Sequence, residues 1–282
     1  AASPAVPSRR VAPWDARRAS KPVHLSLVQH SSADNYYDFR RHYASRVLVF
    51  PEKKLAFCYI EKNACTQFNR LFNALNRRKG RSRDDPWWQS VAPTFGLTPA
   101  AMTRQKGWKW AVFLRDPLMR YLSAWGSKCV QMEDSGANCQ PPRLFSRGSV
   151  EQFEQNVERN HHRQAALVQN PHWAPQQDFC GGLRNASGYD FVGYLHGDVN
   201  AQVRKMLRMV GASEAHVDSF FPKRIIEGHR SHLQMAKYYR SPATQRYVRE
   251  IFKQDYDLPG MNETFLLSRP PGGLPAALTV SG

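Results

Sequence analysis

A pattern that occurs twice along the chain constrains its fold more than any other feature: a short apolar run, a polar loop, then apolar residues at helical spacing. In the first copy, the residues from Leu55 to Ile60 are apolar without interruption, which is typical of a strand covered on both faces. The polar loop 61–66 follows. The helical positions, spaced i, i+3, i+4 and i+7, are Phe68, Leu71, Phe72 and Leu75. The pattern predicts a strand, a loop and a helix in that order.

The second copy begins with a predicted strand from Trp108 to Phe113 and a turn over residues 114–117. The helical face that follows consists of Leu118, Tyr121, Leu122 and Trp125. Two such units predict a single α/β domain in which helices flank a central parallel sheet.

Shorter patterns complete this outline. Residues 47–50 are predicted to pair with the first strand as a hairpin or strand pair, and residues 189–194 to form another short strand. Further helices are predicted over residues 150–168, with a break near Asn160, over residues 199–209 and over residues 244–252.

The composition indicates a globular chain. Hydrophobic residues make up 41% of its 282 residues, enough to bury a sizeable core and to exclude a disordered basic tail. We expect one domain over residues 25–267, with a stem at 1–24 and a Pro/Gly-rich tail at 268–282. The longest interior apolar run is far below the roughly 20 residues that cross a bilayer. Residues 1–22 lack the apolar stretch of a signal peptide and are predicted to form a stem, and the sequence leaves open an anchor removed before Ala1.

The five cysteines are too few for a disulfide scaffold and lack the spacing of a zinc ribbon. Cys129 and Cys139 flank a loop that a disulfide could close, and this pairing stays open. Cys58 lies in an apolar strand and is predicted to be buried without a partner. The sequons at Asn185 and Asn262 permit glycosylation in a secretory lumen without establishing it.

The loop after the first strand carries a lysine in a position suited to anion binding. In α/β sheets, ligands bind at the carboxyl ends of the strands, where helix N-termini offer free N–H groups. The amides of residues 63–66 and the Thr66 hydroxyl could hold a phosphate, and Lys62 could place a charge on the bridging oxygen of a leaving group. In the alternative, Lys62 is a surface lysine and Thr66 only caps the helix.

The loop after the second strand combines an arginine with a serine. Arg115 lies at the strand end, and Ser123 lies in the second turn of the helix that Pro117 opens, so that both could grip one phosphate. In the alternative, Arg115 and Asp116 form a structural ion pair and Ser123 packs on a neighbouring helix. The sequence contains neither a Walker A loop nor a GxGxxG fingerprint, which argues against ordinary P-loop NTPases and Rossmann dehydrogenases.

Together the two loops resemble the signature motifs of sulfotransferases that use 3′-phosphoadenosine 5′-phosphosulfate (PAPS). Residues 62–66, KNACT, are similar to the 5′-phosphosulfate loop, and residues 115–124, RDPLMRYLSA, to the 3′-phosphate motif. The later blocks at 170–176, 189–193 and 238–256 resemble those of the Golgi carbohydrate sulfotransferases. That family includes the chondroitin 4-sulfotransferases and the human natural killer-1 epitope sulfotransferase.

The resemblance implies one α/β domain related to nucleotide kinases, PAPS as the co-substrate, 3′,5′-ADP as the product, and no metal in the transfer step. It implies that Lys62 stabilises the sulfate and the leaving phosphate and that Arg115 and Ser123 bind the 3′-phosphate. The residues that match the 5′-phosphate cradle are Asn63, Ala64, Cys65 and Thr66. It also implies the Golgi lumen and a type II membrane anchor. The chain departs from the family where Glu61 replaces a common proline and where Cys180 replaces a cysteine pair.

In-line sulfuryl transfer needs a general base that takes the proton of the attacking hydroxyl. His172 is the first candidate, because it lies in the Asn-Pro-His-Trp block and imidazole titrates near neutrality. The other candidates are His161, His162 and Glu61, which adjoins the first loop.

The formal charge of +17 fits an anionic donor and a glycan acceptor that is anionic or neutral. The alternative function is a basic module that binds heparin-like chains or nucleic acid without catalysis. The basic residues are spread along the body and no nucleic-acid-binding signature is visible, so no nucleic-acid partner is expected. The acceptor and the oligomeric state are not specified by the sequence.

Overall fold

The computed structural model describes residues 46–78, 89–131, 138–139, 148–167, 170–183, 188–223 and 231–261. All of them belong to the second of two compact units, residues 31–282. The expected stem at 1–24, the expected tail at 268–282 and both sequons, at Asn185 and Asn262, lie outside the described residues. In the described part of the chain, no helix combines the length and the apolar character needed to cross a membrane.

The centre of the fold is a sheet with the strand order β1-β2-β3-β4. Its strands are β1 (Val47–Phe50), β2 (Leu55–Cys58), β3 (Lys109–Leu114) and β4 (Phe191–Tyr194). β2 pairs with β3 and β3 with β4 in parallel, which confirms the α/β prediction. β1 pairs antiparallel with β2 through a tight turn, so the predicted hairpin is also confirmed and the sheet is mostly parallel.

The apolar run of β2 is buried on both faces, as its pattern predicts. Leu55, Phe57 and Tyr59 belong to a core that also contains residues of α1 and α5. Ala56 and Cys58 belong to a second core, on the other face. Because side chains alternate across a strand, a central strand needs this uninterrupted apolar sequence.

The helices include those that the sequence predicts, with boundaries shifted by a few residues. They are α1 (Cys65–Leu75), α2 (Pro117–Trp125), α3 (Val150–His162), α4 (Gln164–Leu167), α5 (Val199–Arg208), α6 (Val217–Phe220), α7 (Ser231–Tyr238) and α8 (Pro242–Ile251). A π-helix, Gly126–Gln131, continues α2. The helix predicted over 150–168 is interrupted at Arg163, close to the predicted break.

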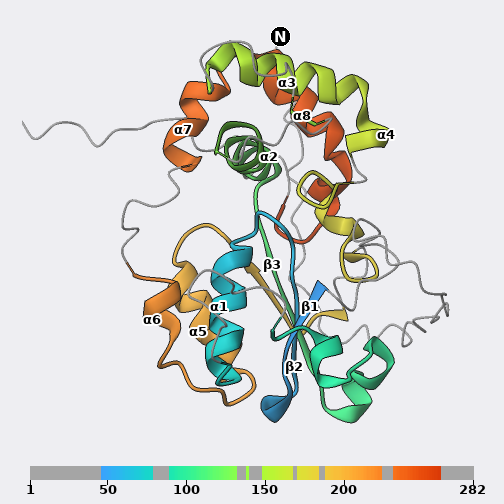
Figure 1. The fold of residues 1–282 in the computed structure, drawn as a ribbon, viewed down its shortest axis with the longest axis vertical. Helices are drawn as coiled ribbons and strands as arrows, with labels where there is room; N and C mark the ends of the chain where they lie inside the picture. Colours follow the sequence, from blue (N-terminus) through green and yellow to red (C-terminus); the bar gives the residue numbers. More distant parts are fainter. Residues whose placement is uncertain are drawn as a thin grey trace, which may run out of the picture. The chain divides into compact units, whose positions relative to one another are not determined.

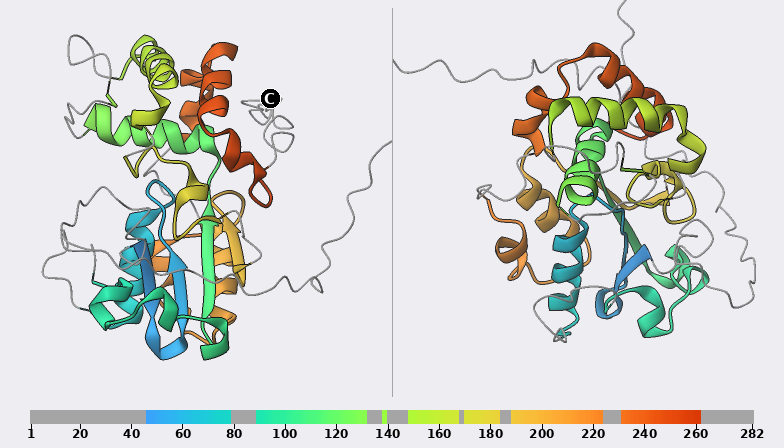
Figure 2. Two further views of the ribbon diagram at one scale, coloured as in Figure 1. Left: turned by 90° about the vertical axis from the view of Figure 1, so that its right-hand side faces the viewer. Right: turned by 45° about the horizontal axis from the view of Figure 1, so that its top comes forward.

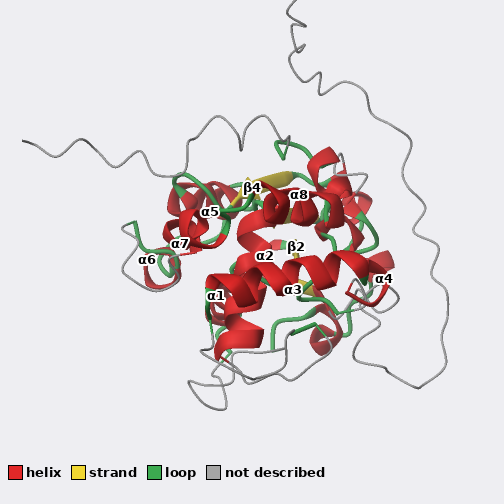
Figure 3. Cartoon of the chain, turned by 90° about the horizontal axis from the view of Figure 1, so that it is seen from above, coloured by secondary structure: helices red, strands yellow, loops and turns green. Residues whose placement is uncertain are grey.

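The helices form distinct groups around the sheet. In Figure 1, α1, α5 and α6 lie beside the strands, whereas α2, α3, α7 and α8 gather beyond the end of the sheet from which β3 enters α2. The left view of Figure 2 shows the same separation from the side, and Figure 3, seen from above, shows α2, α3 and α8 overlying β2. The second group has its own core, in which Tyr121, Trp125 and Phe153 pack edge to face. The loops that follow β2 and β3 therefore lie between the sheet and this helical group.

The structure contains a disulfide that corrects the sequence analysis. Cys58, predicted to be buried without a partner, is bonded to Cys180 across 122 residues of sequence. That prediction was wrong because the partner is brought next to β2 only by the packing of the segment 174–183 on this face of the sheet. Cys65 remains a free thiol.

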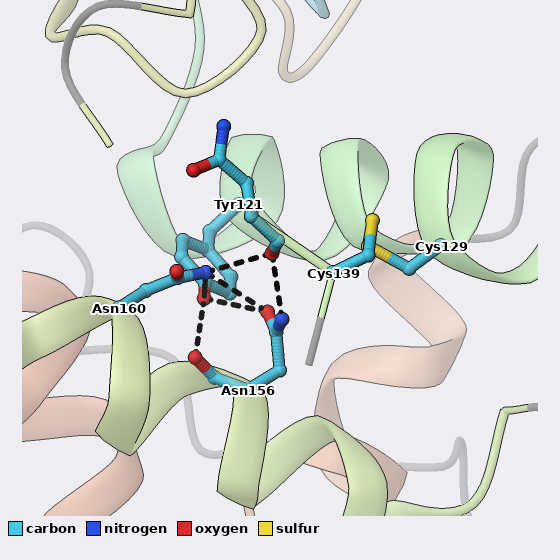
Figure 4. The surroundings of a disulfide bond; sticks show 6 residues. Tyr121, Cys129, Cys139, Asn156 and Asn160 are labelled. Atoms are coloured by element: carbon cyan, nitrogen blue, oxygen red, sulfur yellow. Dashed lines mark hydrogen bonds between the residues drawn. A yellow bond between two sulfur atoms is a disulfide. The ribbon is translucent and has the colours of Figure 1, made fainter. Parts of the chain in front are cut away.

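The second disulfide joins Cys129 and Cys139, the pairing that the sequence left open. α3 anchors it, because Asn156 and Asn160 both donate to the carbonyl of Asn138, at 2.8 and 3.1 Å. Asn156 Oδ1 accepts from the Tyr121 hydroxyl of α2 at 2.8 Å (Figure 4). The Cys129–Cys139 disulfide thus attaches the end of the π-helix to both α2 and α3.

Candidate active site

The loop after β2 has a backbone shape suited to an anion. Lys62 and Ala64 have φ angles of +70° and +55°, in the left-handed region, while Asn63 between them does not. Alternation of this kind turns successive N–H groups toward one side and creates an anion-binding concavity. α1 starts at Cys65 with Ala64 as its N-cap, and no side chain caps it. The first amides of α1, including those of Cys65 and Thr66, have no acceptor within the helix and are available to a ligand.

The loop after β3 reaches the first loop through a guanidinium. Arg115 Nη1 donates to the carbonyl oxygen of Lys62 at 2.7 Å. Burial lowers the pKa of Arg115 to about 10, so the group is cationic at neutral pH. Asp116 caps α2 by accepting from the amides of Leu118 and Met119 at 2.6 and 3.2 Å. Ser123 lies half-buried on α2. The acidic residue of this motif is therefore structural, while Arg115 joins the two loops.

Positive charge accumulates at the first loop. Burial, reinforced by the charges of Lys128 and Arg115, lowers the pKa of Lys62 from 10.5 to about 8. Lys128 lies on the π-helix, one residue before the disulfide-bonded Cys129. The sequence analysis did not single it out, because its position relative to Lys62 depends on how α2 continues. Clustered cations lower one another's pKa values, and such clusters are typical of sites that bind an anion.

His172 lies within the field of the same cations. Burial, together with the charges of Lys128 and Lys62, lowers the pKa of His172 to about 3, so the ring is neutral at physiological pH. Asn170 Oδ1 accepts the backbone N–H of His172 at 3.0 Å and lies 2.9 Å from its Nδ1. Because that oxygen can only accept, Nδ1 carries the proton and Nε2 keeps its lone pair. The charge of Lys62 thus acts on His172, and Nε2 of the ring is left unprotonated.

The remaining candidates for a base lie in other settings. Glu61 is buried and forms an ion pair with Arg46; burial raises the pKa of its carboxyl, and Arg46 opposes the rise. Its position favours a structural role. His161 contacts Glu250 of α8 at 2.7 Å and stacks on Tyr247 at 4.5 Å. His162 is exposed at the end of α3. His161 therefore belongs to the contact between α3 and α8, and His162 packs edge to face on His161 at 5.4 Å.

A buried arginine supports the site through hydrogen bonds to backbone carbonyls. Arg120 of α2 donates through Nε to the carbonyl of Glu61 at 3.0 Å and through Nη2 to that of Pro171 at 3.1 Å; its Nη1 reaches Ala174. It thereby fastens the first loop to the segment that carries His172. The sequence contained this residue in the RDPLMRYLSA motif, but no local pattern indicated that its side chain points into the interior.

The fold and the two loops define an α/β protein whose candidate anion-binding site lies at the carboxyl ends of parallel strands. The model of the sulfotransferase family matches residues 45–258, about three quarters of the chain, so the chain belongs to this family and is an enzyme of sulfuryl transfer. No curated protein and no solved structure matches it. Within the described ranges, no group of three or more His, Cys, Asp or Glu side chains is placed to hold a metal ion.

Proposed function

We propose that this enzyme transfers the sulfuryl group of PAPS to a hydroxyl of a carbohydrate acceptor. The observation that carries the proposal is the direct bond between the loops, in which Arg115 donates to the Lys62 carbonyl at 2.7 Å. It places a helix N-terminus with Lys62 beside a half-buried guanidinium, and a nucleotide with separate 5′- and 3′-anionic groups needs two such sites close together.

Each of these side chains has a distinct task in the proposal. The amides of residues 64–66 and Lys62 bind the 5′-phosphosulfate, and Arg115 with Ser123 binds the 3′-phosphate. The amide of Asn63, which the sequence also offered, instead donates to the carbonyl of Ile60 at 3.1 Å. The acceptor oxygen forms a bond to sulfur while the bond from sulfur to the bridging phosphate oxygen breaks, and 3′,5′-ADP leaves. Lys62 and Lys128 stabilise the charge that develops on the leaving oxygen.

His172 takes the acceptor proton in this proposal. In the free protein its pKa of about 3 makes it a weak base, because burial and, after it, the charges of Lys128 and Lys62 disfavour the imidazolium. A bound donor brings negative charge that offsets these cations, so the pKa of His172 rises when the donor is in place. The lone pair on Nε2 is then able to accept the proton that the hydroxyl releases.

The glycan acceptor and the Golgi lumen are proposed on separate grounds. The charge of +17 favours the approach of anionic substrates, including an acidic glycan. The disulfides Cys58–Cys180 and Cys129–Cys139 suit an oxidising compartment such as the secretory lumen. The motif resemblance adds a type II anchor that precedes this chain.

A thermal-shift titration tests the donor assignment. The ligand is 3′,5′-ADP, with 5′-ADP and 5′-AMP as controls; at 100 times its dissociation constant a ligand stabilises the protein by about 2.7 kcal/mol. We expect the full shift only with the 3′-phosphate. Arg115→Ala should abolish that preference, while Arg208→Ala, which removes an exposed arginine of α5, should keep it. Stabilisation by heparin alone would instead identify a basic polyanion-binding module.

With donor binding established, transfer of labelled sulfate from PAPS to a panel of glycans tests the acceptor class. Incorporation into a glycan hydroxyl supports the proposal. Incorporation only into small phenols or peptides would overturn the carbohydrate assignment while leaving the family intact.

A further inference from the structure

One buried side chain contacts both loops of the site. Gln176 is fully buried, and its Oε1 accepts from Asn63 Nδ2 at 2.7 Å and from the Arg115 backbone amide at 2.9 Å. Its Nε2 donates to the Arg115 carbonyl at 2.8 Å. Asn63 Nδ2 also donates to the carbonyl of Phe113, the residue before the last of β3, at 2.9 Å. The carboxamide of Gln176 thus fills the space between a residue of the first loop and the backbone of the second.

A buried carboxylate fixes the orientation of Gln176. Asp255 Oδ2 accepts from the Gln176 amide at 3.0 Å and lies 3.4 Å from its Nε2. Asp255 Oδ1 accepts from the Gln177 amide at 3.1 Å. Burial raises the pKa of Asp255 to about 6, against the opposing charge of Arg120, so the carboxylate predominates at neutral pH. With its backbone and its Nε2 both bound, Gln176 has one orientation available.

We infer that Gln176 is a positioning residue that sets the spacing between the 5′-phosphosulfate loop and the 3′-phosphate loop, and that Asp255 holds Gln176 in place. This inference rests on the proposed function, because it assumes that both loops bind one donor molecule. The two anionic groups of such a donor are a fixed distance apart on one ribose. Loops that belong to different strands bind both groups at once only if their spacing is set before the ligand arrives.

A positioning role for Gln176 has a consequence for ligand preference that a purely structural role does not have. A ligand with only the 5′-phosphates uses the first loop, whereas 3′,5′-ADP uses both. Loss of the correct spacing therefore weakens the binding of 3′,5′-ADP more than the binding of 5′-ADP. The ratio of the 5′-ADP to the 3′,5′-ADP dissociation constant then falls. A variant that is only less stable binds both ligands more weakly by the same factor, because the same fraction of unfolded protein lowers the apparent affinity for each.

The experiment measures both dissociation constants by isothermal titration calorimetry for the wild type, Gln176→Met and Asp255→Asn. Asp257→Asn is the matched control, since Asp257 is exposed in the same turn as Asp255. Val203→Ala, at a buried core position of α5, is the control for lost stability. We expect the ratio of the 5′-ADP to the 3′,5′-ADP constant to fall about tenfold or more in Gln176→Met and less in Asp255→Asn, which keeps one acceptor oxygen. Both controls should keep the wild-type ratio.

The outcomes separate the inference from the proposed function. A wild type without preference for the 3′-phosphate overturns the donor assignment and the inference together. A wild-type preference that persists in folded Gln176→Met overturns the inference alone. If Gln176→Met does not fold, Asp255→Asn decides: an unchanged ratio there overturns the inference that Asp255 holds Gln176 in the orientation that sets the spacing of the loops.

Discussion

The disulfide between Cys58 and Cys180 is expected to stabilise the fold more than the one between Cys129 and Cys139. The perturbation is replacement of each pair by alanine, Cys58→Ala with Cys180→Ala in one variant and Cys129→Ala with Cys139→Ala in the other. The bonded cysteines are 122 residues apart in the first pair and 10 in the second. A cross-link restricts the unfolded chain more when it closes a longer loop.

The magnitudes follow from these separations. Loop-closure entropy gives about 5 kcal/mol for the longer loop and about 3 kcal/mol for the shorter one, a difference of about 2 kcal/mol. Both variants lose two sulfur atoms, so the packing loss largely cancels from the comparison. The first disulfide also connects the strand before Lys62 to the segment after Gln176, so its removal should loosen the site as well.

Urea unfolding without reductant, which keeps the remaining disulfides intact, followed by circular dichroism, measures the free energy of unfolding of both variants and of the oxidised wild type. The longer-loop variant should show the lower midpoint with a similar slope. Equal losses in the two variants, or a larger loss for the shorter loop, would refute the reasoning from chain entropy.

Further predictions concern the proposed catalytic groups. Lys62→Ala should abolish sulfuryl transfer while calorimetry still detects 3′,5′-ADP bound through Arg115; unchanged turnover would contradict the role of Lys62. Because the pKa of Lys62 is about 8 and a bound anion raises it, binding of 3′,5′-ADP at pH 8 should take up about half a proton, seen as a dependence of the binding enthalpy on the buffer. Lys62→Arg should remove that uptake. Arg115→Ala should weaken the binding of 3′,5′-ADP about ten- to a hundredfold, by loss of charge-assisted hydrogen bonds. His172→Asn should lower kcat about 100-fold or more with little change in donor affinity; a wild-type kcat would transfer the role of base to another group.

The locally encoded features of this protein were predictable from its sequence. The apolar run at 55–60 and the helical spacing from Phe68 to Leu75 depend only on neighbours within a few positions, and they specify strand, loop and helix correctly. Two such units imply parallel strands, which place the loops of Lys62 and Arg115 at the same end of the sheet. The candidate residues of both loops could therefore be named without a structure.

Other features depend on segments that are distant in sequence. The pairing of Cys58 with Cys180, the contact of Gln176 with both loops and the field of Lys128 at Lys62 each join residues more than 50 positions apart. From the sequence alone, His161, His162 and Glu61 also stayed open beside His172, the first candidate for the base.

Packing separated these candidates, by burying Glu61 against Arg46 and by placing His172 near Lys62. Sequence periodicity reports which face of an element is buried, and this was enough to determine the strands, the helices and the loops between them. Which side chains meet, and how far burial shifts their pKa values, is set by the three-dimensional packing of elements that are far apart in the chain, so only the tertiary structure decided the composition of the site.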